Sequence, residues 1–134
     1  MASGCESCRT AEESLRKAFV TTLLLAGSAA SADAALLEAV VRIDREEELL
    51  EKAVEIALRM PPVSDLKAHA LLPLELRLVL KLSSNLRRCF VLRMLLGWPS
   101  ERCARMLQME SSRIDEQTCI AARALAEIAV ERVA

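Results

Sequence analysis

The sequence is poor in the residues that break helices. It has three glycines and four prolines in 134 residues, few runs of β-branched side chains, and many Ala, Leu, Glu and Arg residues. These residues favour helices over strands and turns, so we expect an all-α fold of about six helices. Hydrophobic residues make up 53% of the chain, which is ample for a core and excludes a disordered chain.

Aromatic side chains are also scarce, because the chain has no Tyr and only Phe19, Phe90 and Trp98. Proteins that hold single-stranded nucleic acid stack its bases on aromatic side chains. None of these three residues lies in the segment between the expected second helix and Pro61, where such stacking would be needed. We therefore do not expect this protein to open a DNA duplex.

The residue patterns of most enzymes are missing too. His69 is the only histidine and has no evident nucleophile or orienting partner. The sequence has no Gly-rich phosphate loop and no paired-carboxylate motif, and Glu46–Glu48 has the pattern of a solvated face. We expect a non-enzymatic protein without a cofactor.

The five cysteines do not form a metal-binding pattern. Cys5 and Cys8 have the C-x-x-C spacing of half a zinc site or of a redox dithiol, but no second pair follows at finger spacing. Cys89, Cys103 and Cys119 lie in amphipathic segments, where a free thiol behaves as a small hydrophobic group. Such thiols are typical of a reducing compartment.

Charge and hydropathy limit the possible partners. The formal net charge is −1, so DNA binding would need a local basic patch. No apolar run reaches the roughly 20 residues of a membrane span. The first residues do not have a basic region followed by an apolar one, so we expect a cytoplasmic protein.

The first part of the chain has the pattern of a helical hairpin. Residues 1–9 read as frayed, Thr10–Glu13 has the spacing of a capping box, and Gly27 is placed to end the first helix. Ser31 or Asp33 is placed to cap a second helix. Its apolar side is predicted to consist of Leu36, Val40 and Ile43. The acidic run beginning at Asp44 favours a break before a further helix, although a continuous helix through Glu46–Glu48 stays open.

Two prolines, Pro61 and Pro62, prevent helix continuation and mark a linker. We place the domain boundaries at 1–60 for an N-terminal helical lobe, 61–70 for the linker and 71–134 for a C-terminal lobe.

The C-terminal lobe has the outline of a helix-turn-helix. The apolar residues of its first helix are Leu86, Cys89, Phe90 and Met94, and Gly97 and Pro99 separate this helix from the next. The second helix is short, with Cys103, Met106 and Leu107 facing inward. After a turn at 108–110, a third helix begins at Ser111. Its inward residues recur at alternating steps of four and three: Ile114, Thr118, Ala121, Leu125 and Ile128.

The third helix is the main candidate for binding. In a DNA-binding reading, its first turns meet the major groove and the preceding helix meets phosphates. The groove candidates are Ser111, Ser112, Arg113, Glu116 and Gln117, and the phosphate candidates are Arg102 and Arg105. Its outward residues Cys119, Ile120 and Arg123 are the candidates for contact with a protein.

A family resemblance follows from residues 82–97 (LSSNLRRCFVLRMLLG) and 98–107 (WPSERCARML). This run resembles region four of the bacterial RNA polymerase sigma factors, most closely the extracytoplasmic-function type. The matching positions are Arg87, Leu92, Arg93, Gly97, Ala104 and Leu107. The chain departs from the family at Gln108, where a glycine is usual, and at Asp115 and Glu116, where Lys and Arg are usual.

The N-terminal hairpin is similar to a reduced region two of the same family. Residues 32–42 (ADAALLEAVVR) match at Ala32, Glu38 and Arg42. They depart at Ala34 and Leu37, which stand where the family has residues of its clamp-binding face.

The resemblance implies a non-enzymatic, transcription-related protein with promoter DNA, RNA polymerase core or a sigma regulator as partner. Two hypotheses stay open. In one, the helix-turn-helix binds duplex DNA. In the other, a degenerate module has lost that contact and acts through protein association, as a homodimer or by binding a regulator.

Overall fold

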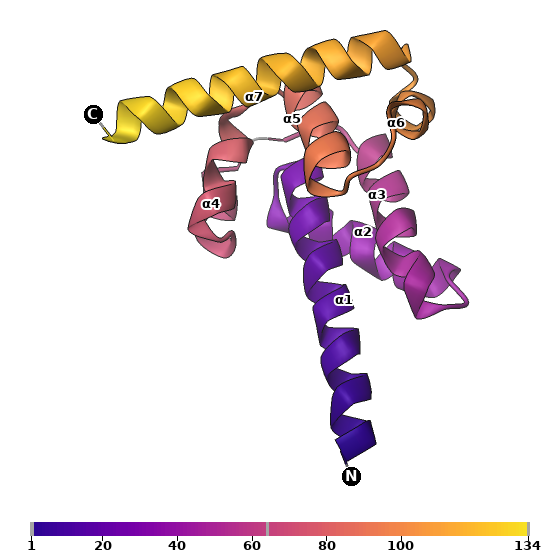
Figure 1. Ribbon diagram of the computed structural model, residues 1–134. Coiled ribbons are helices and arrows are strands. Elements are labelled where there is room, and N and C mark those ends of the chain that lie inside the picture. The colour runs from indigo at the N-terminus through magenta and orange to yellow at the C-terminus, as the bar shows by residue number, and fades with distance from the viewer. Residues whose placement is uncertain (1, 64, 134) are drawn as a thin grey trace. The chain divides into compact units, whose positions relative to one another are not determined.

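All the secondary structure that we observe is helical, which confirms the all-α prediction. The computed structural model describes residues 2–63 and 65–133, and none of these residues lies in a strand (Figure 1). The described part contains seven α-helices: α1 (Ala2–Ala26), α2 (Ala29–Arg42), α3 (Leu49–Arg59), α4 (Leu74–Arg77), α5 (Ser84–Phe90), α6 (Ser100–Leu107) and α7 (Ser111–Val133). Short 3-10 turns η1 (Glu46–Glu48), η2 (Leu66–Leu71) and η3 (Leu78–Lys81) connect them, and a π-helical turn, η4 (Val91–Leu95), follows α5.

The chain divides into two compact units, unit 1 (Met1–Val63) and unit 2 (Ser64–Ala134). The division falls inside the segment 61–70 that the sequence marks as a linker. Part of that segment is ordered locally, because the Asp65 side chain accepts a hydrogen bond from the Lys67 amide at 3.0 Å at the start of η2.

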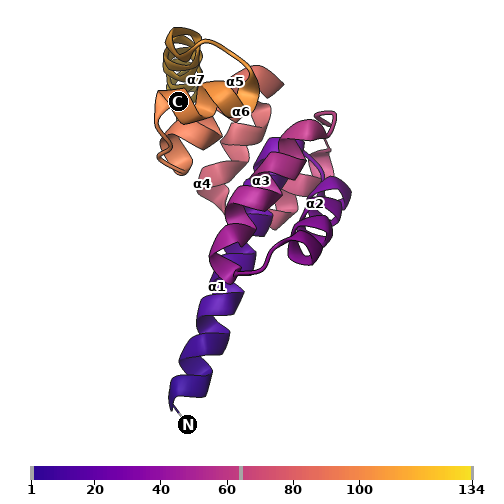
Figure 2. The same ribbon diagram turned by 90° about the vertical axis from the view of Figure 1, so that its right-hand side faces the viewer.

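Unit 1 is a bundle in which α1, α2 and α3 pack against one another (Figure 2). Its core is made of aliphatic and alanine side chains: Ala18, Leu23, Leu24, Leu25, Ala32, Ala35, Ala39, Ala53, Val54 and Ala57. The buried Thr22 hydroxyl donates to the carbonyls of Ala18 and Phe19 at 2.8 and 2.9 Å, so it adds no unsatisfied polar group to this core.

The first helix is longer than the sequence indicates. We expected residues 1–9 to be frayed and Thr10 to cap the helix, but α1 begins at Ala2 and Thr10 lies in its interior. The first half of α1 extends beyond α2 and α3 (Figures 1 and 2). The side chains of Cys5 and Cys8 lie outside the described part of the structure. The predicted end is confirmed, because Gly27 has a left-handed φ of 85° and its amide donates to the Leu23 carbonyl.

The predicted start of α2 was wrong, and of its predicted apolar side Leu36 and Ile43 are half-buried while Val40 is exposed. Ser28, not Ser31 or Asp33, is the N-cap, and its side chain accepts from the Ser31 amide at 3.2 Å. The face packed on α1 and α3 consists of alanines, which allow close approach, whereas Val40 is 50% exposed. The predicted break near Asp44 is present, since α2 ends at Arg42 and α3 begins at Leu49.

In unit 2, α5 and η4 form one rod, and α7 packs along α5 and α6. The rod ends at Gly97, which has a φ of 70°. A Cβ at Gly97 would meet nothing within 4 Å, so the backbone conformation is the reason for glycine here. Arg87 is buried on α5 at 3% exposure, and its Nη1 donates to the Leu80 carbonyl at 3.5 Å. Burial, and secondly the charge of Arg88, lower the pKa of its guanidinium.

We expect Leu23→Ala to lower the free energy of unfolding by about 2–5 kcal/mol, because this side chain is fully buried and its loss leaves a cavity. Leu15→Ala, the same change on the same helix at a 46% exposed position, should cost under about 1 kcal/mol. Urea unfolding followed by far-ultraviolet circular dichroism measures both. Equal losses would contradict the packing described for α1.

Candidate nucleic-acid interface

The corner between α6 and α7 depends on one residue in a left-handed conformation. Gln108 has φ 57° and ψ 48° and is the only non-glycine residue with positive φ in the described part of the chain. The Met109 amide donates to the Ala104 carbonyl at 3.0 Å, and the Glu110 carbonyl accepts from the Arg113 and Ile114 amides. The turn at 108–110 and the start of α7 at Ser111 are therefore as predicted.

The inward residues of α7 also follow the prediction. Ile114, Thr118 and Ala121 are buried, and Leu125 and Ile128 are half-buried. The Thr118 hydroxyl donates to the Ile114 carbonyl at 2.7 Å, so the polar atom in this row is satisfied. This row fixes which side of α7 faces solvent.

One inward residue of the first helix was predicted wrongly. Met94 is 57% exposed, whereas Val91 and Leu92 are buried. The cause is η4, in which the Leu96 amide donates to the Val91 carbonyl five residues earlier. A π-turn takes more residues than an α-turn, so it rotates the following side chains away from the face that a regular helix would give them.

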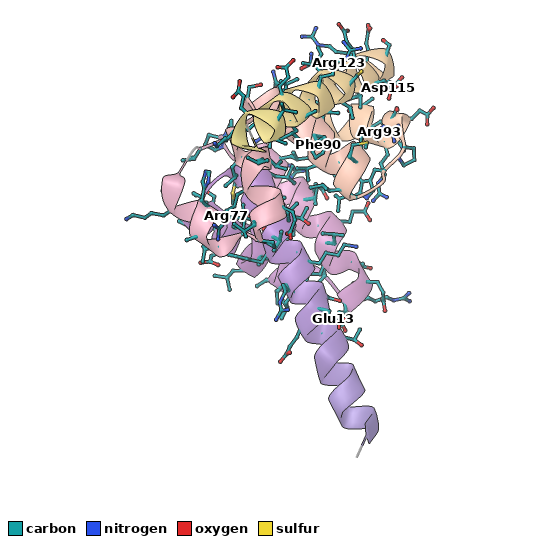
Figure 3. All side chains as sticks on the ribbon, turned by 60° about the vertical axis from the view of Figure 1, so that its left-hand side comes forward. Glu13, Arg77, Phe90, Arg93, Asp115 and Arg123 are labelled. Carbon is teal, nitrogen blue, oxygen red and sulfur yellow. The ribbon has the colours of Figure 1, made fainter. Side chains whose placement is uncertain are left out.

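A cluster of three polar residues connects the start of α7 to α6 and η4. The Ser100 hydroxyl lies 2.5 Å from the Asp115 carboxylate, and Arg93 Nε lies 3.5 Å from the same carboxylate. Arg93 Nη1 also donates to the Trp98 carbonyl at 2.9 Å. Figure 3 shows Arg93 and Asp115 together near the start of α7, with Arg123 further along the helix.

This cluster, which we call the Asp115 cluster (Arg93, Ser100 and Asp115), was missed at the sequence level. The sequence showed Asp115 only as a departure from the family, at a position where Lys or Arg is usual. Its carboxylate instead has a cation and a hydroxyl as neighbours, so part of its charge is compensated within the fold. The sequence gives no local signal for this cluster, because Asp115 lies 15 or more residues after its two neighbours in the chain.

The residues predicted to bind DNA lie on two adjoining elements, α6 and the first turns of α7. Arg105, Ser112, Arg113 and Glu116 are exposed, and Arg102, Ser111 and Gln117 are half-buried. Arg102 lies over the Trp98 ring, with its guanidinium carbon 3.8 Å from the ring centroid, so a cation–π contact holds it beside the turn before α6. The protein-contact candidates Cys119, Ile120 and Arg123 are all exposed.

The charge of the chain differs between the two units. Unit 1 has seven Lys and Arg against eleven Asp and Glu, a formal charge of −4, and unit 2 has eleven against eight, a formal charge of +3. The near-zero net charge of the whole chain therefore conceals a basic excess in unit 2. A basic unit is what phosphate binding requires.

The two cysteines in the core of unit 2 are poor nucleophiles. Burial, and secondly the neighbouring Cys103, raise the pKa of the Cys89 thiol to about 11. Burial likewise raises the pKa of the Cys103 thiol, which lies 3.8 Å from the Trp98 carbonyl. Both thiols stay protonated near neutral pH and serve as small core residues.

Comparison with known proteins gives no relative: no family model, no curated protein and no solved structure matches this chain. Among the described residues, no three His, Cys, Asp or Glu side chains gather closely enough to bind a metal ion. No described helix combines the length and the apolar character that crossing a membrane demands.

We expect Gln108→Gly to raise the free energy of unfolding of unit 2 by about 0.5–1 kcal/mol, because glycine adopts the left-handed conformation without a Cβ penalty. Gln108→Ala removes the same side chain but keeps the Cβ, so it should not stabilise. The single tryptophan, Trp98, lies in unit 2, and its fluorescence in urea measures this unfolding. Equal stability of the two variants would contradict the role of φ at this corner.

Arg93→Met should lower the free energy of unfolding of unit 2 by about 1–2 kcal/mol, since it removes the hydrogen bond to the Trp98 carbonyl and the contact with Asp115. Arg105→Met is the matched control at an exposed position, and it should change stability by under about 0.5 kcal/mol. Arg and Met have similar helix propensity, so the difference isolates these contacts. Trp98 fluorescence in urea again measures the unfolding. Equal losses of stability in the Arg93→Met and Arg105→Met variants would refute the role of the Asp115 cluster.

Proposed function

We propose that this protein is a non-enzymatic, sigma-factor-like transcription protein whose unit 2 binds duplex DNA through α7. The observation that carries the proposal is the α6–α7 corner, which exposes the first turns of α7 while Ile114, Thr118 and Ala121 hold its other side in the core. This is the arrangement in which a helix-turn-helix protein inserts its second helix into the major groove.

The electrostatics support the same proposal. The basic charge belongs to unit 2, and three arginines, Arg102, Arg105 and Arg113, lie on α6 and the first turn of α7. In the proposal, Arg102 and Arg105 bind phosphates and set the position of the protein on the duplex.

The groove contacts are then made by Ser111, Ser112, Arg113, Glu116 and Gln117. Glu116 has no ion-pair partner within the described residues. A carboxylate at this place accepts from the amino group of cytosine, and it repels phosphates when the base pair offers no such donor. Glu116 therefore both selects sequence and weakens binding to unselected DNA.

A second candidate function is protein association through the outward side of α7. Two observations favour it: on α7, Ile120 is 42% exposed and Val130 is 67% exposed. In this case the partner is a transcription protein, such as RNA polymerase core or a sigma regulator, and the helix-turn-helix is a scaffold.

Fluorescence anisotropy with a labelled random-sequence duplex tests DNA binding by the full chain. We expect binding that weakens steeply between about 50 and 200 mM salt, because each phosphate contact releases a counterion. We expect Glu116→Gln to strengthen binding about 3–10-fold, since it removes a charge that repels phosphates at close range. Glu75→Gln makes the same charge change at an exposed position on α4 and should have a much smaller effect.

Two results would overturn the DNA proposal: no binding at the lowest salt concentration, or identical effects of Glu116→Gln and Glu75→Gln. In that event, comigration of the chain with purified bacterial RNA polymerase core in gel filtration would support the second candidate. Loss of that complex on Ile120→Glu, with Leu74→Glu as the exposed control, would assign it to α7.

A further inference from the structure

Helix α2 is apolar on two opposite sides. Its packed side consists of Ala32, Ala35 and Ala39, all fully buried. Its solvent side carries a second row at steps of four, three and four residues: Ala30, Ala34, Leu37 and Val41. We call this row the α2 stripe. Leu37 is 69% exposed and Val41 is 85% exposed, with Val40 beside them at 50%.

A helix with apolar residues on both sides normally has both sides covered. The steps of the α2 stripe are those of positions a and d in a coiled coil, with Ala30 and Leu37 at d and Ala34 and Val41 at a. Such a row fits another helix lying along it. The question is which helix covers it.

The α2 stripe is complementary to itself when two copies run in opposite directions. With a two-fold axis between positions 34 and 37, Ala34 faces Leu37 of the other copy, and Ala30 faces Val41. Each large side chain then lies opposite an alanine, which is how closely packed helices fill the space between them. Because both copies use the same patch for this contact, no free patch is left, and the assembly stops at two copies.

The charges beside the α2 stripe select the antiparallel direction. Asp33 occupies a g position and Glu38 an e position, and in a parallel pair these two carboxylates would face each other twice. In the antiparallel pair Asp33 faces Val40, and Glu38 faces Ser31. Glu38 is in addition paired with Arg42 of its own helix at 2.6 Å, so no like charges oppose each other.

We propose that the α2 stripe is a self-association surface, on which α2 of a second copy of this chain packs in antiparallel orientation. The 14 residues of α2 provide less area than the ~1,600 Å² of a standard stable interface, so the dimer is weak, with a dissociation constant of about 10–100 µM. The stripe belongs to unit 1, so this inference stands apart from DNA binding by unit 2.

Sedimentation velocity of the full chain in reducing buffer, from about 1 to 500 µM, tests the proposal. The weight-average mass should rise from 14.7 kDa toward twice that value. Leu37→Glu should raise the dissociation constant at least tenfold, because it places two carboxylates in an apolar contact. Leu74→Glu, on α4 of unit 2 and also 69% exposed, should leave the dimer unchanged.

A mixing experiment tests the pairing of Ala34 with Leu37. Ala34→Lys alone should also dissociate the dimer. An equimolar mixture of the Ala34→Lys and Leu37→Glu chains should recover dimers, because the new lysine then faces the new glutamate and the remaining alanine faces the remaining leucine. In a parallel pair the mixture would stay monomeric, since residue 34 of one copy would face residue 34 of the other, and residue 37 would face residue 37.

Three results would overturn the proposal. The first is a monomeric mass at every concentration, as expected if another protein covers the α2 stripe. The second is a dimer that Leu37→Glu leaves intact, and the third is a mixture that fails to recover dimers. Far-ultraviolet circular dichroism of each variant checks that the helices are retained, which we expect because the substituted positions are exposed.

Discussion

The arrangement of unit 2 depends on the left-handed backbone of Gln108. Without a reversal at this residue, α6 would continue in its own direction, and α7 could not place Ile114, Thr118 and Ala121 against the preceding helices. A non-glycine residue in this conformation costs roughly 1–2 kcal/mol. The burial of the inward row of α7 offsets this cost, because a fully buried isoleucine alone contributes about 1.5–3 kcal/mol. The turn at Gln108 therefore allows the inward row of α7 to be buried, and that burial stabilises the turn.

The charge distribution shows why composition over a whole chain is a weak guide to partners. A net charge of −1 argues against nucleic acid only if the charges are mixed, and here they are not. The acidic excess lies in unit 1 and the basic excess in unit 2. The same separation bears on self-association, because a dimer formed through α2 brings together two acidic units. Only short-range apolar contacts between the stripes could hold them together, and salt would assist by screening the repulsion.

The parts of the fold that the sequence predicts correctly are those fixed by neighbours in the chain. The turn at 108–110, the start of α7 and its inward row follow from breakers and helical spacing over a few residues. The failures have other causes. Met94 faces solvent because one π-turn shifts the register, and α2 turns its alanines inward because α1 and α3 approach closely. Of the candidate site, the positions of the exposed residues were predictable, but the Asp115 cluster was not. Asp115 is hydrogen-bonded to a residue 15 positions earlier and ion-paired with one 22 positions earlier, which is beyond the reach of helical periodicity.

The two acidic departures from the sigma-like pattern differ in physical kind, although the sequence presents them as a pair. Asp115 contacts Arg93 and Ser100, so its negative charge is partly compensated within the fold. Glu116, the next residue, is exposed and has no ion-pair partner among the described residues. An exposed carboxylate without an ion-pair partner fits a base-reading helix, which uses such an acceptor, and equally fits a helix that binds protein. The choice between DNA and protein as the partner of α7 therefore rests on the environment that Glu116 meets when α7 is bound.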